Sequence, residues 1–290
     1  MTRFSGIAPA VSSRLLNEQF GQTAQNIDFE AGRVTPITEE TTVGGVLAST
    51  SKGSIFYHDS VSPRWLQWDE DYVKAVEGPI PGDNEDRLYW TGEGTYPKMS
   101  HHDAILPSGG GAAPAVSYRL GIPAPAALGI AEPAGDVDED VEPIDVAYVM
   151  TWVSNFGEEG PPSSVTVTKT FTPTTQSITI TRPSLPSGNY AVSATQGDFP
   201  YVALWRLYRS AVGATQASFL LAKEDSITAT TFVDSLEPAQ LLEVLPSTTW
   251  IGPPDDVTAT YPDGPMQGLI PVANGVFAGF TGKRLCLSEA

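Results

Sequence analysis

A mainly β fold is predicted by three features of this 290-residue sequence. Short runs of aromatic and β-branched residues recur along the chain, and several alternate apolar and polar residues with the period of a strand. Turn-forming residues are frequent, with 27 Gly and 25 Pro and no collagen-like repeat. The one fair helical pattern lies near the N-terminus. These features together indicate many short strands joined by turns.

The strongest predicted strand lies within residues 146–163, where an apolar run stops at a charged turn. Aromatic and β-branched residues suit a half-buried pleated surface. The turn contains residues that cannot continue a sheet ladder: Gly157, Gly160, Pro161 and Pro162. Glu158 and Glu159 are adjacent in this turn, and we expect both to be solvated.

Further strands are predicted over roughly a hundred residues after position 146. Residues 165–168 and 177–181 alternate apolar and polar side chains, and residues 202–208 and 230–233 extend the series. Pro, Gly or Asp stands near most of the breaks between them. Such a series is typical of an antiparallel β-sandwich of the immunoglobulin or fibronectin type III kind.

A second β region precedes the sandwich. Residues 54–57, 65–68 and 87–90 are aromatic strand-like runs followed by turn residues, which predicts a β-sheet platform of partly propeller-like character. A Pro-rich connector places a boundary near Ile122, and an Asn-Gly turn before an apolar run at residues 274–280 predicts a return to the platform. We therefore predict three parts: residues 1–122 as N-terminal arm and platform, 123–247 as inserted sandwich, and 248–290 as returning platform.

The N-terminal arm holds the helix candidate. Leu16, Phe20, Ala24 and Ile27 fall near one face at a period of 3.6 residues, while Gly21 limits any helix to short pieces.

An acidic run occupies residues 132–145, with seven carboxylates and no basic residue. Within it, residues 136–140 place carboxylates at alternate positions, as calcium-binding loops do. The helix-loop-helix type of calcium site does not fit, because Val141 replaces its turn glycine and Ala147 replaces its bidentate glutamate. A solvated loop is therefore preferred over a structural cation site.

The net charge of -18 and a pI near 4.4 exclude a typical sequence-reading nucleic-acid protein, because the 16 basic residues are scattered. An acidic surface still suits a channel through which DNA slides without sticking. Cys286 is the single cysteine, so an intrachain disulfide cannot form and assembly in a reducing cytoplasm is compatible. The pattern predicts neither a signal peptide nor a membrane span.

Three short motifs contain residue types found in active sites or metal sites, but none predicts a catalytic, cofactor-binding or metal-binding residue. His101-His102-Asp103 is more simply a loop histidine pair than a metal site, since neighbours in an extended segment point to opposite faces. His58 beside Asp59 lacks a nucleophile elbow elsewhere and is read as a strand-end residue. Residues 279–283 lack the first glycine and the Ser or Thr of a phosphate loop.

Two further groups of residues left alternatives open. One group consists of aromatic residues suited either to stacking on sugar rings or, as we prefer, to core packing: Trp65, Trp68, Tyr89 and Trp90. The other consists of adjacent carboxylates in predicted turns, Glu158-Glu159 and Asp255-Asp256, whose adjacency does not show the facing geometry that glycoside hydrolysis needs.

Several passages, taken together, resemble bacteriophage tail nozzle and related tail-tube or head-to-tail virion proteins. Residues 6–9, 14–16, 24–32 and Pro36 resemble the start of these proteins, and residues 118–125 resemble the connector after their first β segment. The passages that resemble their inserted fibronectin-like module and the strands after it are residues 148–163, 205–210, 232–234, 274–280 and 287–289. The passages follow the same order over nearly the whole chain.

The resemblance implies a structural component of a tailed bacteriophage virion, assembled in the host cytoplasm. Several copies, such as six, would form a ring around the DNA ejection channel, contact other tail or connector proteins and bind no specific DNA sequence. It implies neither enzyme activity nor a cofactor, and no membrane insertion. The similar proteins continue for a few hundred β-rich residues beyond the position of Ala290, so we expect a neighbouring chain to supply the remaining sheets or these sheets to be absent.

Subunit contacts are expected at the N-terminal arm and the acidic run. The alternative function is a tail-tip or fibre module that binds host surface glycan through the sandwich or exposed tryptophans. A secreted glycan-degrading enzyme with a fibronectin-like accessory domain is the third hypothesis, and it is disfavoured because neither a signal peptide nor a catalytic constellation is predicted.

Overall fold

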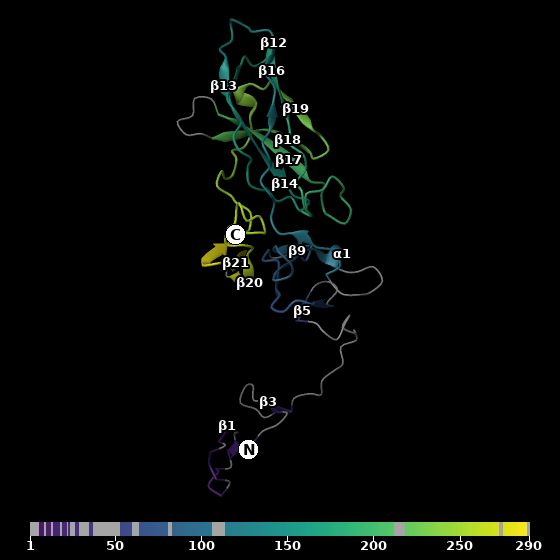
Figure 1. Cartoon of the computed structure of the whole chain (residues 1–290), viewed down its shortest axis with the longest axis vertical. Coiled ribbons are helices and arrows are strands. Elements are labelled where there is room, and N and C mark those ends of the chain that lie inside the picture. The colour runs from purple at the N-terminus through teal and green to yellow at the C-terminus, as the bar shows by residue number, and fades with distance from the viewer. Residues whose placement is uncertain are drawn as a thin grey trace. The chain divides into compact units, whose positions relative to one another are not determined.

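The computed structural model describes residues 6–8, 10–12, 14–17, 19–21, 23, 27–28, 35–36, 53–59, 64–80, 83–105, 114–211, 218–272 and 275–288. The chain divides into two compact units, residues 1–46 and 47–290, drawn in Figure 1. The fold is mainly β with several antiparallel sheets, as the sequence predicts. The helical elements among the described residues are a four-residue helix α1 (His102–Ile105) and a 3-10 turn η2 (Pro238–Gln240).

The first unit contains four short strands among its described residues. β1 (Gly6–Ile7) pairs in parallel with β2 (Phe20–Gly21), and β3 (Ile27–Asp28) pairs antiparallel with β4 (Thr35–Pro36). The predicted helix is therefore wrong, because two of its four marker residues, Phe20 and Ile27, lie in strands. Ala24, a third marker, lies outside the described residues.

Local hydrogen bonds explain why this segment does not propagate a helix. The Leu15 N–H donates to the Ser12 carbonyl, and the Gln19 N–H donates to the Asn17 side-chain oxygen. The backbone thus turns locally at Ser12–Leu15, the Asn17 side chain competes with helical hydrogen bonds, and Gly21 is a poor helix former.

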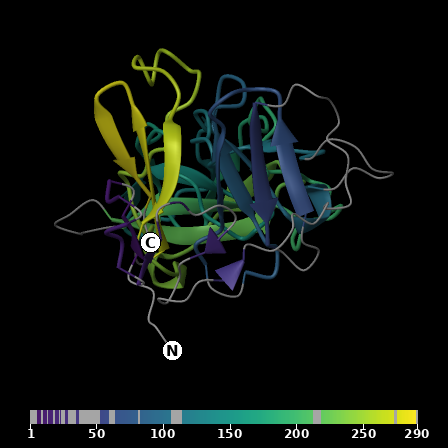
Figure 2. The same cartoon turned by 90° about the horizontal axis from the view of Figure 1, so that it is seen from below.

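The platform of the second unit consists of three sheets. The middle sheet has the order β10 (Tyr118–Arg119), β9 (Lys98–Ser100), β8 (Leu88–Thr91), β7 (Lys74–Glu77). One outer sheet is the hairpin β5 (Ser54–His58) and β6 (Arg64–Trp68). The other has the order β20 (Gln267–Val272), β21 (Val276–Thr281), β22 (Arg284–Leu287). Figure 2 shows the C-terminal strands in yellow beside the platform strands in blue.

Side-chain alternation in β8 fixes this layering. All four residues of β8 are buried. Leu88 and Trp90 pack in one cluster with Leu66 and Trp68 of β6, whereas Tyr89 packs in another with C-terminal residues that include Phe277. Because successive side chains of a strand point to opposite faces, the hairpin covers one face of the middle sheet and the C-terminal sheet covers the other.

The remaining strands form a sandwich-like pair of layers, shown grouped together in Figure 1. One layer has the order β14 (Tyr148–Val153), β17 (Leu204–Ser210), β18 (Phe219–Ser226). The other centres on β16 (Gln176–Thr181), which pairs with β11 (Gly129–Ile130), β12 (Ala134–Gly135) and β19 (Thr231–Asp234). β13 (Ile144–Val146) pairs with β15 (Lys169–Phe171).

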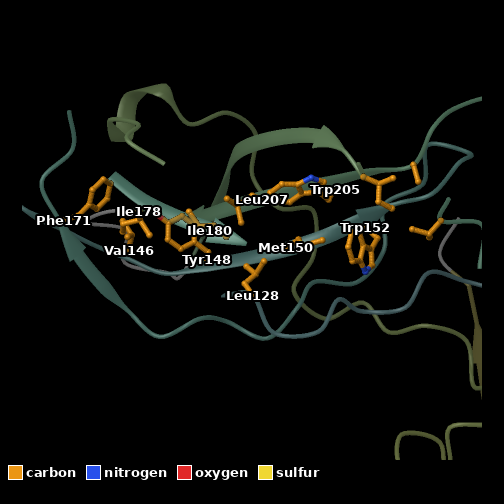
Figure 3. Close-up of a cluster of buried hydrophobic side chains, with 13 residues drawn as sticks. Leu128, Val146, Tyr148, Met150, Trp152, Phe171, Ile178, Ile180, Trp205 and Leu207 are labelled. Atoms are coloured by element: carbon orange, nitrogen blue, oxygen red, sulfur yellow. The ribbon is translucent and has the colours of Figure 1, made fainter. Parts of the chain in front are cut away.

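The sandwich core lies between these layers. Tyr148, Met150 and Trp152 alternate along β14 and pack with Ile178 and Ile180 of β16 (Figure 3). The opposite face of β14 is also covered, since Val149 belongs to a second buried cluster with residues of β17 and β18. The predicted strand after position 146 is confirmed, but it is buried on both faces rather than half-buried.

The predicted strand at residues 165–168 is wrong. This segment has no regular ladder, because the hydroxyls of neighbouring Ser and Thr side chains accept from β14: Tyr148 N–H donates to Thr166 Oγ1 and Met150 N–H donates to Ser163 Oγ. Val165 and Val167 are exposed. The predicted strands at 177–181, 202–208 and 230–233 correspond to β16, β17 and β19.

The three-part division at residues 122 and 247 and the propeller-like character stay predictions. Both boundaries lie inside the second unit. The C-terminal strands nevertheless pack on the same middle sheet as the hairpin. Asn274 of the predicted Asn-Gly turn lies outside the described residues, and Gly275 has the positive φ of 78° that the turn between β20 and β21 requires.

Candidate functional site

His58 is a buried strand-end residue of β5. Its Nδ1 lies 3.1 Å from Glu77 Oε1, and the same oxygen accepts the Asp59 N–H at 2.8 Å. Glu77 belongs to β7, so the interaction fixes the hairpin against the edge of the middle sheet. No hydroxyl or thiol nucleophile is hydrogen-bonded to His58 in the interactions of the described residues, and its contacts are those of a structural residue.

His101 lies at the junction of platform and sandwich. It is fully buried, it stacks on the Phe199 ring at 5.1 Å between centroids, and Phe156 meets it edge-on at 5.5 Å. Tyr118 stacks more loosely on its ring at 6.3 Å. The predicted loop histidine pair is therefore right only for His101, which lies outside regular secondary structure but is buried in an aromatic cluster; His102 begins α1 at an intermediate exposure.

Acid should loosen this junction through His101. Burial is the main cause that lowers the pKa of His101, while Asp103 and Asp198 act in the opposite direction. The unfolded state therefore binds the proton first, and stability is full above the unfolded value of about 6.5 and falls below it, by up to about 1.4 kcal/mol per pH unit.

His101→Phe keeps the aromatic packing and should remove this part of the pH dependence. We expect denaturant unfolding at several pH values from 7.5 to 5 (roughly the window of this titration) to show a shallower slope for the variant. Glu85 Oε2 lies 3.8 Å from His101 Nδ1, and burial raises the pKa of Glu85, so only the difference between the two proteins isolates the histidine. Equal slopes would contradict the assignment.

Arg87 is the strongest polar link between platform and sandwich. Its Nε donates to Asp83 Oδ2 at 2.7 Å, its Nη1 pairs with Glu158, and its guanidinium lies 5.1 Å from the Phe156 ring centroid. Arg87 is buried and precedes β8, whereas Glu158 and Phe156 follow β14. Glu158 is exposed, as expected of a solvated turn residue, but it is also held at the junction by its ion pair with Arg87.

Arg87→Met should lower the free energy of unfolding by about 2–3 kcal/mol, less than for a fully buried pair because Glu158 is half exposed. The remaining Asp83 carboxylate would lose its cation in a largely buried position. Calorimetry of the full chain measures the change, and Lys169→Met, whose partner Glu132 is exposed, is a control expected to cost about 0–1 kcal/mol. Equal effects of the two substitutions would contradict the role of Arg87.

Asp255 and Asp256 pair with Arg119 of β10 and so attach the segment after the sandwich to the middle sheet. Arg119 Nη2 donates to Asp255 Oδ2 at 3.1 Å and also pairs with Asp256, which accepts from Thr95 at 2.8 Å. The Arg119 guanidinium lies 3.9 Å from the Tyr96 ring centroid. The hydrogen bond from Arg119 is the main cause that lowers the pKa of Asp256. These adjacent carboxylates therefore bind a structural arginine and face no second acid.

The Glu159 side chain is only 9% exposed, so the expectation that it is solvated is wrong. Its carboxylate accepts from Thr151 Oγ1 at 2.5 Å, from the Tyr208 hydroxyl at 2.6 Å and from Arg206 Nη1 at 2.9 Å. Burial, and then the bond to Glu159, raise the pKa of Tyr208. The turn after β14 places Glu159 against side chains of β14 and β17, whereas Glu158 pairs with Arg87 of the platform. The two adjacent glutamates therefore have different partners.

A buried ion pair lies inside the sandwich core. Arg209 Nη1 donates to both oxygens of Asp234, at 3.1 and 2.9 Å, and to the Leu236 carbonyl at 2.8 Å. The Tyr148 hydroxyl donates to Asp234 Oδ2 at 2.6 Å. Both charged side chains are 0% exposed. This network ties β14 and β17 to β19 across the two layers.

The aromatic candidates divide into core and surface. Trp68, Tyr89 and Trp90 are buried, which confirms core packing for these three. Trp65 is 46% exposed and lies beside Tyr57, with ring centroids 5.2 Å apart. A groove of about 520 Å³ between β5, β7 and the β20–β21 turn has Tyr57, but not Trp65, in its lining. Of the four aromatic candidates, Trp65 is therefore the one that remains available to a ligand or partner.

The other candidates have structural surroundings. Residues 136–140 are mostly exposed, and the Asp140 N–H donates to Asp138 Oδ1 in a local turn. Gly279 lies within β21, and a Cβ there would approach Met266 Cγ to 2.7 Å, so close packing rather than phosphate binding requires this glycine. Across the described residues, no group of three or more His, Cys, Asp or Glu side chains is placed to hold a metal ion.

In the part of the chain that the structure describes, no helix has the length and apolar character needed to cross a membrane. No protein-family model matches the chain, and no curated protein sequence matches it. Function is therefore inferred from the residues and their arrangement.

Sequence reasoning missed the charged residues that form buried or partly buried ion pairs: Arg87, Arg119, Arg209 and Asp234. The sequence contains a signal for two of them. Arg87 and Arg209 directly adjoin apolar strand residues, and a charge inside a buried strand requires a partner because burial of an unpaired charge is costly.

Proposed function

We propose that this protein is a structural component of a tailed bacteriophage virion, a ring-forming tail nozzle, tube or adaptor subunit around the DNA ejection channel. In this proposal the sandwich is a fibronectin type III-like module inserted into the platform. The protein would act through geometry and catalyse nothing, with DNA passing the acidic surface without specific binding.

The observation that carries the proposal is the set of large apolar side chains that the platform leaves exposed on its outer strands. They are Ile55, Tyr57, Trp65, Ile270, Val272, Phe280, Leu285 and Leu287. Extended apolar sheet surfaces of this kind mark interaction sites in soluble proteins. The Arg87–Glu158 ion pair supports the proposal as well, because it links platform and sandwich.

A second candidate function is a tail-tip or fibre module that binds host surface glycan. The exposed Trp65–Tyr57 pair favours it, since aromatic faces stack on sugar rings. Under this hypothesis a glycan array would show binding that Trp65→Ala abolishes.

Labelling of intact phage particles tests the proposal. Particles released from a host that carries this sequence should contain the chain by mass spectrometry, and antibodies to it should label the tail or the head-to-tail junction at several copies per particle. Absence of the chain from purified particles would overturn the proposal, and glycan binding without particle association would favour the second candidate.

A further inference from the structure

The outer face of the C-terminal sheet is apolar and exposed. Cross-strand pairing places Phe280 opposite Leu285, and it places Ala278 opposite both Ile270 and Leu287, so these side chains share one face. We define the C-terminal face by its exposed members: Ile270, Val272, Phe280, Leu285 and Leu287. Leu285 is 72% exposed. The inner face, with Phe277, is already occupied by the middle sheet.

The outer face of the β5–β6 hairpin is the second exposed apolar surface of the platform. Tyr57 pairs with Trp65, and Ile55 lies two residues away on the same face. We define the hairpin face by Ile55, Tyr57 and Trp65, all exposed. The hairpin and the C-terminal sheet cover opposite faces of the middle sheet, and their two apolar surfaces meet at one groove beside β7, which Tyr57 and Val272 both line.

The two faces carry opposite charge. Residues 264–288 contain no Asp or Glu and two basic residues, Lys283 and Arg284, in a chain with 34 carboxylates. The hairpin, in contrast, is followed at both strand ends by exposed carboxylates: Asp59, Asp69, Glu70 and Asp71. Arg284 already pairs with Asp263 of its own chain, at 3.1 Å, so Lys283 gives the C-terminal face its basic edge, whereas the hairpin face has an acidic edge.

From this complementarity we infer that the C-terminal face of one copy docks on the hairpin face of a second copy. Apolar side chains supply the buried area, and Lys283 faces the carboxylates at the ends of the neighbour's hairpin strands. Two C-terminal faces would instead bring like charges together. This contact would join neighbouring subunits of the proposed ring, and in that respect the inference rests on the proposed function.

Contact between different faces has a geometric consequence. A heterologous contact leaves one free face on each partner, so copies continue to add until a ring closes. An isologous contact between identical faces would stop at a dimer. Because the docking faces are two different surfaces of the platform, their contact provides head-to-tail growth.

Single-face variants of the full chain test the inference by native mass spectrometry and analytical ultracentrifugation. Leu285→Asp blocks the C-terminal face, Trp65→Asp blocks the hairpin face, and each should weaken association by about thirtyfold, as loss of a central apolar contact does. Ile55→Asp is a second hairpin variant in case Trp65 supports the local fold. Val167→Asp, at an equally exposed valine of the sandwich, should leave association unchanged.

Mixing the two blocked variants gives the sharpest result. Each retains one intact face, so an equimolar mixture of Leu285→Asp and Trp65→Asp should form a one-to-one dimer and no larger species. Loss of assembly in Leu285→Asp but not in either hairpin variant would overturn the head-to-tail contact in favour of an isologous one. Quenching of Trp65 fluorescence by N-acetylglucosamine oligomers would reassign the hairpin face to glycan.

Failure of the inference is distinguishable from failure of the proposed function. If the wild-type chain assembles and neither blocked face changes the assembly, the docking faces are wrong and the ring proposal stands. If the wild-type chain stays a monomer at every concentration tested, both are overturned.

Discussion

Arg209→Met is expected to destabilise the protein by about 3–5 kcal/mol, because it leaves the Asp234 carboxylate buried without its cation. Both side chains are fully buried, and Arg209 Nη1 binds both carboxylate oxygens of Asp234. The Tyr148 hydroxyl and the Leu236 N–H still donate to Asp234, but neither carries a charge. Urea unfolding of the full chain measures the loss.

Two companion variants separate the ion pair from general core disruption. Arg209→Met combined with Asp234→Leu removes both charges and should recover much of the lost stability, since replacing a whole buried pair by apolar residues is often nearly neutral. Lys223→Met breaks an exposed pair with Asp225 and should cost about 0–1 kcal/mol. A double variant no more stable than Arg209→Met would show that packing, and not charge, dominates at this position.

Trp90→Ala should cost about 3–5 kcal/mol, the range for removal of a large buried aromatic side chain. Trp90 is fully buried between the hairpin and the middle sheet, it lies 5.9 Å from the Trp68 ring, and its Nε1 donates to Glu93 at 2.5 Å. The truncation opens a cavity and leaves Glu93 without this donor. Thermal unfolding followed by circular dichroism measures the effect.

Trp65→Ala is the matched control for Trp90→Ala, with the same change of side chain on the outer face of the β5–β6 hairpin that covers Trp90. Since Trp65 is half exposed, we expect a loss of about 1 kcal/mol or less in the monomer. Similar losses for the two tryptophans would contradict the division into a core and a surface aromatic group.

The strands that local side-chain pattern determines were predictable from the sequence. The alternation at β16 and the aromatic run at β14 reflect side-chain packing on a pleated surface, which sequence records directly. The segment at 165–168 shows the limit: it alternates like a strand, but hydroxyls of Ser163 and Thr166 take the ladder positions along β14. Alternation does not reveal which acceptor a backbone N–H will use.

Long-range pairing was not predictable from local pattern. Trp205, Leu207 and Arg209 continue one period of two, which marks Arg209 as inward-facing, but its partner Asp234 lies 25 residues later. The contact between Arg209 and Asp234 depends on the register in which β19 pairs with β16. The layering of the platform depends likewise on two clusters on opposite sides of β8; the sequence predicts that Trp68, Tyr89 and Trp90 are core residues but not which cluster each one joins.

Cryo-electron microscopy of intact particles tests the central proposal most directly. The account predicts several copies of the chain arranged as a closed ring around the DNA channel, with the C-terminal face of each copy against the hairpin face of the next. Particles in which the chain is absent, or present as isolated copies that enclose no channel, would contradict it.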